Sequence, residues 1–112
     1  GWHPDEKEQY GAAQRDAWRT VQRGHAIANG VYVAAVNRVG HEKLAGAGIE
    51  FWGSSFLCDP FGVVMAEAGV DTEETLIGEV DLAHIEEVRC HWPFLRDRRI
   101  DAYAGLDRRF LD

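Results

Sequence analysis

The chain is poor in cysteine and proline. Its 112 residues include 2 cysteines, Cys58 and Cys90, and 3 prolines. Two cysteines are too few for a disulfide framework, which favours a reducing compartment, although one bridge between them is compatible with the sequence. With 46% hydrophobic and 11% aromatic residues, the composition is that of an ordinary globular protein and excludes a disordered tail. A chain of this length forms one domain at most.

Basic charge and long apolar runs are also lacking. The 19 acidic residues outnumber the 12 basic residues, and the net charge of -7 repels phosphate backbones and anionic lipid surfaces. No run approaches the roughly 20 apolar residues that span a bilayer. The first residues, GWHPDEKEQ, lack the basic and apolar regions of a signal peptide. We therefore predict a cytoplasmic protein with no nucleic-acid partner and no membrane partner.

One long helix is predicted near the beginning of the chain. Residues 1–11 are polar and irregular and predict a loop, whereas apolar residues recur at helical intervals over 12–29. The predicted apolar face has four members: Trp18, Val21, His25 and Ala28. Asn29 and Gly30 then end the helix, because both tolerate positive φ.

Four strands and a second helix are predicted after it. The strands are runs of β-branched or alternating apolar residues, at 31–36, 49–58, 63–68 and 75–80. A loop is predicted over 38–48, Gly53 interrupts the second strand, and residues 59–62 match a type I turn. Asp81 is placed to cap a helix that ends near Trp92. This order of elements fits the second half of a layered α/β sandwich, whose free sheet edge and apolar face favour association.

Several separated motifs occur in the order found in a known family. They are the segment IEFWGSSFLCDPFG from Ile49 to Gly62, the strand end VYVAAVNRVG that contains Asn37, the helix with Trp18 and Gly24-His25-Ala26, and the tail HWPFLRDRRIDAY around Trp92. With these motifs the chain resembles the carbon-nitrogen hydrolase (nitrilase) family, closest to the N-carbamoylputrescine amidases. The resemblance covers nearly the whole chain.

The resemblance implies an α/β fold, the C-terminal half of an α-β-β-α sandwich. Residues 1–112 would form a partial domain, completed by oligomerisation or by the missing N-terminal half. It also implies hydrolysis of N-carbamoylputrescine to putrescine, carbon dioxide and ammonia, without a cofactor. In the family a cysteine thiolate attacks the ureido carbon, a glutamate moves protons and a lysine stabilises the oxyanion. All three positions precede Gly1, so we expect no catalytic residue here and no activity from the chain alone.

Four residues are candidates for lining a substrate pocket near the ends of strands and in loops: Trp2, Asn37, Glu42 and Ser54. The carboxylate of Glu42 could attract a substrate ammonium. A role in turn or loop structure is the alternative for each residue, and Ser54 could hold the strand geometry beside Gly53.

Six residues are candidates for an oligomer interface: Trp18, His25, Trp92, Phe94, Arg96 and Tyr103. The arginines of the tail alternate with Asp97, Asp101 and Asp107, which favours ion pairs within or between subunits over phosphate binding. Because exposed pairs contribute only roughly 0 to 1 kcal/mol each, the aromatic contacts of the tail should matter more.

Other arrangements that suggest chemistry are weaker. Cys58 sits in a strand and Cys90 at a helix end, and neither has the surroundings of a nucleophile. The segment GSSFL lacks the second glycine of a nucleophile elbow. His84, Cys90 and His91 lack metal-ligand spacing, so no metal is expected. Two other functions stay open: a non-catalytic remnant that acts as an oligomeric interaction module, and a different substrate within the same superfamily.

Overall fold

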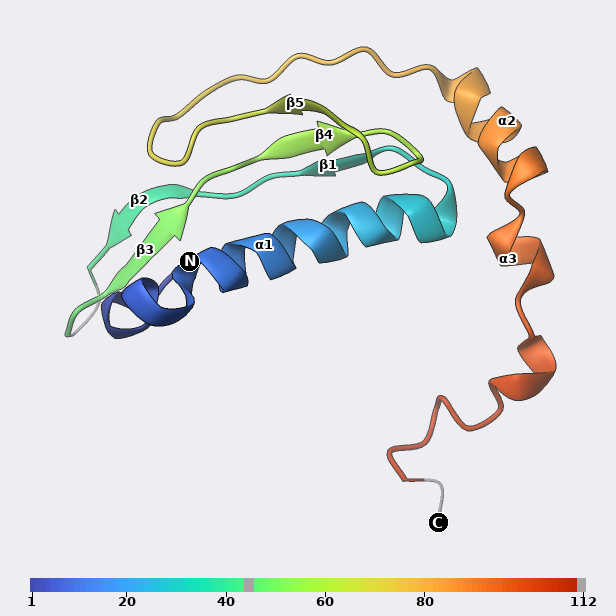
Figure 1. Cartoon of the computed structure of the whole chain (residues 1–112), viewed down its shortest axis with the longest axis horizontal. Helices are drawn as coiled ribbons and strands as arrows, with labels where there is room; N and C mark the ends of the chain where they lie inside the picture. The colour runs from blue at the N-terminus through green and yellow to red at the C-terminus, as the bar shows by residue number, and fades with distance from the viewer. Residues whose placement is uncertain (44–45, 111–112) are drawn as a thin grey trace.

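The computed structural model describes residues 1–43 and 46–110 (Figure 1). In chain order the elements are α1 (Pro4–Asn29), β1 (Val33–Ala35), β2 (Val39–Glu42), β3 (Ile49–Trp52), β4 (Phe56–Cys58), β5 (Val64–Glu67), α2 (Leu82–His91), α3 (Phe94–Asp97) and the 3-10 helix η1 (Ile100–Ala102). Strands β1, β4 and β5 form an antiparallel sheet, and β2 and β3 form a separate two-stranded ribbon. Helix α1 runs alongside both (Figure 1). The arrangement is mixed α/β, with one helix layer against one sheet layer.

Helix α1 begins at Pro4, so the predicted loop over 1–11 is wrong from Pro4 onward. Proline is favoured in a first helical turn, because its missing N–H has no partner to lose there and its φ is preset for a helix. Asp5 and Glu6 in the same turn interact favourably with the helix dipole. The helix ends as predicted, at Gly30 with a φ of 58°.

Only Trp18 of the four predicted residues lies on the side of α1 that faces the sheet. Val21 is 57% exposed, and His25 and Ala28 also face solvent. Trp18 and Ala26 pack on the sheet. Three arginines accompany them on this side and donate hydrogen bonds to the strands or their turns: Arg15, Arg19 and Arg23. The aliphatic stem of an arginine can cover apolar surface while its guanidinium group reaches a polar atom. This side of α1 therefore packs on the strands although its sequence is polar.

The core lies between α1 and the three-stranded sheet. Ala26 of the helix packs with Ala35, Phe56 and Cys58 of the strands. Trp18 stands edge-on to Phe56, with 5.9 Å between the ring centroids. The register places Ala35 opposite Phe56, and since side chains alternate along a strand, the same face of β4 also carries Cys58.

The predicted strand over 49–58 is two strands. Gly53 and Ser54 both have positive φ, 51° and 57°, so the chain leaves β3 before it enters β4. The predicted interruption at Gly53 is therefore confirmed. The predicted loop over 38–48 is wrong in part, because β2 forms there and pairs with β3.

The predicted strand over 75–80 is not formed within the described part of the chain. The connection from β5 to α2 is instead a long extended segment (Figure 1). Gly78 lies so close to β4 that a Cβ on it would collide with Leu57. A strand needs a partner for its backbone N–H and C=O groups, so the alternating sequence pattern alone does not produce one.

The chain after this segment follows the prediction more closely. Asp81 caps α2, with its Oδ1 accepting a hydrogen bond from the N–H of Ala83 at 2.9 Å. The tail then forms α3 and η1 and extends away from the sheet (Figure 1). Among residues 1–43 and 46–110, no helix is long and apolar enough to cross a membrane.

Candidate functional site

The break between β3 and β4 is a densely hydrogen-bonded irregular segment. Asn37, just after β1, donates from Nδ2 to the carbonyl of Gly53 at 2.8 Å. Its backbone N–H donates to Ser55 Oγ at 2.9 Å, and Ser55 Oγ donates back to the Asn37 carbonyl at 3.2 Å. The backbone N–H of Gly53 donates to the carbonyl of Arg38. The break is thus fastened to the chain between β1 and β2.

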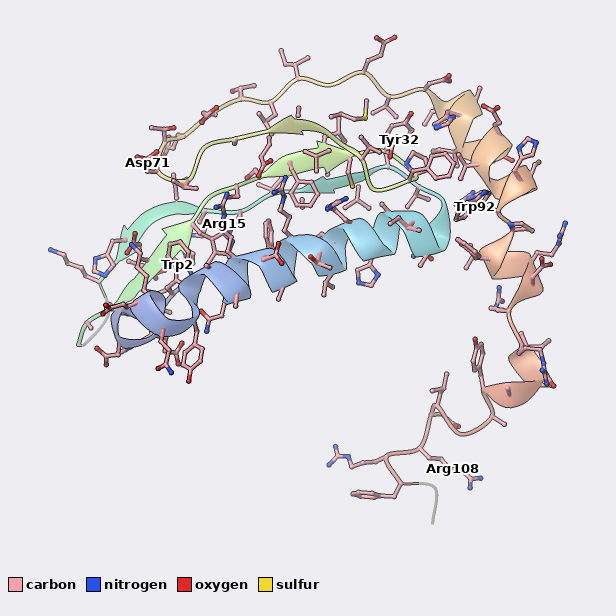
Figure 2. All side chains as sticks on the ribbon, viewed as in Figure 1. Trp2, Arg15, Tyr32, Asp71, Trp92 and Arg108 are labelled. Atoms are coloured by element: carbon pink, nitrogen blue, oxygen red, sulfur yellow. The ribbon has the colours of Figure 1, made fainter. Side chains whose placement is uncertain are left out.

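Ser54 lies inside this break and is fully buried, with 0% exposure. Its hydroxyl donates to the carbonyl of Trp52 at 2.9 Å and accepts from Nε of Arg15 at 2.8 Å. Figure 2 shows Arg15 extending from α1 toward the strands. The backbone N–H of Ser54 donates to the carbonyl of Gly69. Ser54 therefore has the geometry of a residue that fixes the backbone, which is the alternative role that its position beside Gly53 predicts.

A polar hollow of about 400 Å³ opens beside Asn37. It is lined by Val36, Asn37, Arg38, Val39, Ser55, Thr72, Glu73 and Glu74. The amide, hydroxyl and carboxylate groups in this set can hydrogen-bond a small polar molecule and favour a cationic group over an anionic one. The positive charge of Arg38 is directed elsewhere, since its Nη1 donates to Glu42 Oε2 at 2.7 Å and its guanidinium lies 4.1 Å from the ring centroid of Phe51.

The other three candidate pocket residues, Ser54 among them, lie outside this lining. Glu42 is on β2 and forms an ion pair with Arg38. Trp2 forms a β-bridge with Glu50 of β3, donates from Nε1 to the carbonyl of Gly11 at 2.8 Å, and packs on Trp52 with 5.2 Å between ring centroids. Asn37 thus bonds the two residues that flank Ser54, while Trp2 and Glu42 lie at the β2–β3 ribbon. Substrate binding by these four residues stays a prediction.

Two parts of this site are missed by reasoning from the sequence. The helical pattern places Arg15 away from the apolar face of its helix, and nothing in the sequence distinguishes a guanidinium that turns inward. The acidic side of the hollow, with Glu73 and Glu74, has the sequence of an ordinary polar loop. No signal in the sequence locates it, because this loop meets the end of β1 only through tertiary packing.

The candidate interface residues occupy different surroundings. Trp18 belongs to the core, and His25 is exposed on the outer side of α1. Half-exposed aromatic side chains follow α2: Trp92 at 51%, Phe94 at 46% and Tyr103 at 48%. Arg96 hydrogen-bonds Asp97 and thereby lowers the pKa of that carboxyl group. The predicted interface stays a prediction.

The two cysteines are free and differ in access. Cys58 is buried and Cys90 is exposed, and burial raises the pKa of the Cys58 thiol. Cys90 lines a second, largely apolar hollow of about 340 Å³ at the end of α1, together with Ala28, Asn29, Arg89, Trp92, Pro93, Phe94, Leu95 and Arg96. Neither thiol reaches the polar hollow beside Asn37.

This chain belongs to the carbon-nitrogen hydrolase family, whose characteristic pattern matches residues 6–90. N-carbamoylputrescine amidase of Arabidopsis thaliana is 40% identical over 105 residues, which are 90% of this chain and 35% of that protein. Citrullinase of Francisella tularensis is 34% identical over 96 residues, 86% of this chain and 34% of that protein. Omega-amidase NIT2 of Bos taurus is 39% identical over 87 residues, 77% of this chain and 30% of that protein.

Solved structures share the fold. A carbon-nitrogen hydrolase from Helicobacter pylori G27 superposes with a TM-score of 0.85 at 47% identity, over 98% of this chain and 37% of that one. XC1258 from Xanthomonas campestris, a CN-hydrolase superfamily protein with an arsenic adduct in its active site, has a TM-score of 0.67 at 32% identity, over 77% of this chain and 31% of that one. The predicted family is thus confirmed, and this chain spans about a third of the length of these relatives.

Proposed function

We propose that this chain is the portion of an N-carbamoylputrescine amidase-like hydrolase that forms one wall of the substrate site. The observation that carries the proposal is the polar hollow at the end of β1, where Asn37 and Ser55 are locked together by hydrogen bonds and share the lining with Glu73 and Glu74. Similarity to the Arabidopsis amidase along 90% of the chain supports a ureido amine as substrate.

The wall would contribute binding and not the reacting groups. Following the family pattern, we assign the attacking thiolate, the proton-moving glutamate and the oxyanion-stabilising lysine to a segment that precedes this chain. The two cysteines present here are poorly placed to attack a substrate, because Cys58 is buried in the core and Cys90 lines the apolar hollow. On this proposal the chain alone hydrolyses nothing.

The charge of the hollow suits a substrate with a terminal ammonium group. Glu73 and Glu74 belong to its lining, and Glu42 is paired with Arg38. Glu74 Oε1 already accepts hydrogen bonds from the N–H of Gly69 and the hydroxyl of Thr72. Asn37 uses one Nδ2 hydrogen on Gly53, so its second hydrogen can be donated to a ureido oxygen. The net charge of -7 would also steer a cationic substrate toward the protein.

Complementation tests this function. The chain is mixed with a separately expressed N-terminal portion of a carbon-nitrogen hydrolase, and ammonia release from N-carbamoylputrescine is measured. We expect release from the mixture and none from either part alone. Citrulline and an ω-amide serve as competing substrates, because a citrullinase and an omega-amidase are among the relatives. A folded mixture that prefers the ω-amide would overturn the ureido assignment, and one that prefers citrulline would overturn N-carbamoylputrescine as the particular ureido substrate. Both outcomes retain the hydrolase.

Association with further protein is part of the same proposal. The binding partner we propose is a second copy of the chain or the N-terminal half of the fold. We place this association in the cytoplasm, where the two free thiols would stay reduced. The tail carries apolar side chains that extend from the body: Ile100 at 73%, Leu106 at 78% and Phe110 at 71% exposure. Such side chains favour an interface.

The same exposed tail supports the second candidate function, a non-catalytic oligomeric module. Sedimentation velocity on the chain alone separates the two. A stable oligomer that gives no ammonia in any complementation mixture would favour the module. A monomer that associates only with the N-terminal portion would favour the hydrolase.

A further inference from the structure

The geometry points to Arg15 as a positioning residue for Asn37 in the lining of the polar hollow. It acts from α1, through the break between β3 and β4. This inference rests on the proposed function for its catalytic consequence, although the structural part stands without it. Arg15 is on α1, 39 residues away from Ser54 in sequence, and its Nε donates to Ser54 Oγ at 2.8 Å. It does not line the hollow.

The backbone at the break needs such support. Gly53 and Ser54 have consecutive positive φ values of 51° and 57°, and the left-handed region is disfavoured for a residue with a Cβ such as Ser54. A conformation of this kind persists only where the surroundings hold it. The hydroxyl of Ser54 is held from both sides, by Arg15 as donor and by the carbonyl of Trp52 as acceptor.

The neighbours of Ser54 carry this geometry to the hollow. The carbonyl of Gly53 accepts from Asn37 Nδ2, and Ser55 Oγ bonds both the N–H and the carbonyl of Asn37. Asn37 is therefore attached to the residue on each side of Ser54. A shift of Ser54 moves these attachment points, so Arg15 acts on Asn37 without touching it.

The same helix supplies a matched control. Arg19 lies one turn further along the same side of α1 and donates to Glu67 on β5, with no hydrogen bond to the break among the described residues. Arg15 also lies near Glu67, with Nη2 at 3.9 Å from Oε1, so an effect transmitted through Glu67 would appear in both arginine variants. Only an effect transmitted through Ser54 is particular to Arg15.

Hydrogen exchange on the whole 112-residue chain tests the structural part. We expect Arg15→Met to accelerate exchange at the amides of Asn37, Gly53 and Ser54 by about tenfold or more, as expected for local opening, with the amides of β4 unchanged. Arg19→Met should leave the three amides unchanged. Equal acceleration everywhere, or none at the three amides, overturns the inference.

Ser54→Gly gives a second route if Arg15→Met is poorly folded. Glycine accepts the left-handed backbone without strain, so this variant removes the hydroxyl and keeps the turn. We expect it to accelerate exchange at Asn37 as Arg15→Met does. The double variant should exchange no faster than Ser54→Gly alone, because Ser54→Gly already removes the hydrogen bond from Arg15 together with the one to the Trp52 carbonyl. Additive acceleration would show that Arg15 acts by another route.

The kinetic part uses the complemented hydrolase. We expect Arg15→Met to raise KM for N-carbamoylputrescine about tenfold with kcat changed less than about threefold, since a displaced binding wall weakens ground-state and transition-state binding alike. Arg15→Lys should restore part of the loss, because an ammonium can also donate to Ser54. An unchanged KM overturns the positioning role. If the unmodified mixture releases no ammonia, the proposed function fails while the exchange experiment still decides the role of Arg15.

Discussion

Trp92 stands edge-on to Phe61, with 5.7 Å between the ring centroids and 85° between the ring planes. The contact joins the turn after β4 to the C-terminal end of α2, where Trp92 is the C-cap residue. Trp92 makes a second edge-on contact with Phe94, at 5.5 Å. Arg89 adds a hydrogen bond from its Nε to the carbonyl of Asn29 at the end of α1. These contacts hold the C-terminal helices against the body.

Trp92→Ala should therefore loosen the tail without unfolding the chain. Edge-on aromatic pairs are worth about 0.5–1.5 kcal/mol each beyond area burial, and Trp92 is half exposed, so we expect a loss of roughly 1–2 kcal/mol in the free energy of unfolding. Urea unfolding measures it, and proteolysis after α2 should become faster. Phe110→Ala, at a 71% exposed residue, is the control and should change little. Unchanged stability and oligomerisation in Trp92→Ala would contradict a docked tail.

Trp18→Ala should lower the free energy of unfolding more than Trp92→Ala does, by about 3 kcal/mol or above. This is the range measured when large aromatic side chains are removed from cores. Trp18 packs against the core cluster and stands edge-on to both Trp52 and Phe56. The matched control is Val21→Ala on the same helix, 57% exposed, for which we expect a change within about 0.5 kcal/mol. If thermal unfolding shows the two variants to be equally destabilised, the outer side of α1 is covered by another molecule.

Local signals in the sequence predict the turns and caps correctly. Asp59 Oδ1 accepts from the N–H groups of Phe61 and Val63, and the N–H of Gly62 donates to the Asp59 carbonyl, which is the turn that residues 59–62 predict. The Asp81 cap and the stop at Gly30 also form as predicted. In each case the interacting residues are only a few positions apart, so both partners can be recognised in one short stretch of sequence.

Apart from the start of α1 at Pro4, where a local helix signal is missed, the errors involve partners distant in sequence. The segment 75–80 has strand character but finds no partner strand in the described chain. Arg15 is polar, and only its partner 39 residues away shows that it packs inward. The hollow beside Asn37 needs the turn at Thr72 to reach the end of β1. Which segments meet is decided by tertiary packing, and a single sequence does not specify that.

Gly53→Ala tests whether the break between β3 and β4 requires glycine. A Cβ on Gly53 would lie 2.6 Å from the carbonyl oxygen of Gly69 and 2.8 Å from Cγ1 of Val39, and the φ of 51° is itself unfavourable for alanine. We expect a loss of about 2 kcal/mol or more in the free energy of unfolding. Gly40→Ala is the control, because Gly40 also has positive φ but no described atom lies within 4 Å of its Cβ position. A loss no larger than that of the control would remove the steric part of the explanation.

The two thiols give a prediction about access. Cys90 is exposed and Cys58 is buried, so a thiol reagent such as DTNB should label one cysteine rapidly in the native chain and the second only as the chain unfolds. Cys90→Ala should abolish the rapid phase, while Cys58→Ala should retain it. Rapid labelling in Cys90→Ala would show that the sheet opens beside α1 under native conditions.

Burial also makes Cys58 a source of alkaline instability. It raises the pKa of this thiol, and the neighbouring Asp59 charge raises it further. Below the ordinary thiol pKa of about 8.5, the thiol is protonated in both states and its stabilising contribution is fully present. As the pH rises above that value, the thiol ionises first in the unfolded state. The free energy of unfolding therefore falls, by at most about 1.4 kcal/mol per pH unit, until the pH reaches the raised pKa of the folded state. Urea unfolding between about pH 8 and pH 10.5 should therefore show a steeper loss in Cys90→Ala, which keeps the buried thiol, than in Cys58→Ala. Parallel losses in the two variants would mean that the thiol of Cys58 is as accessible in the folded chain as in the unfolded one.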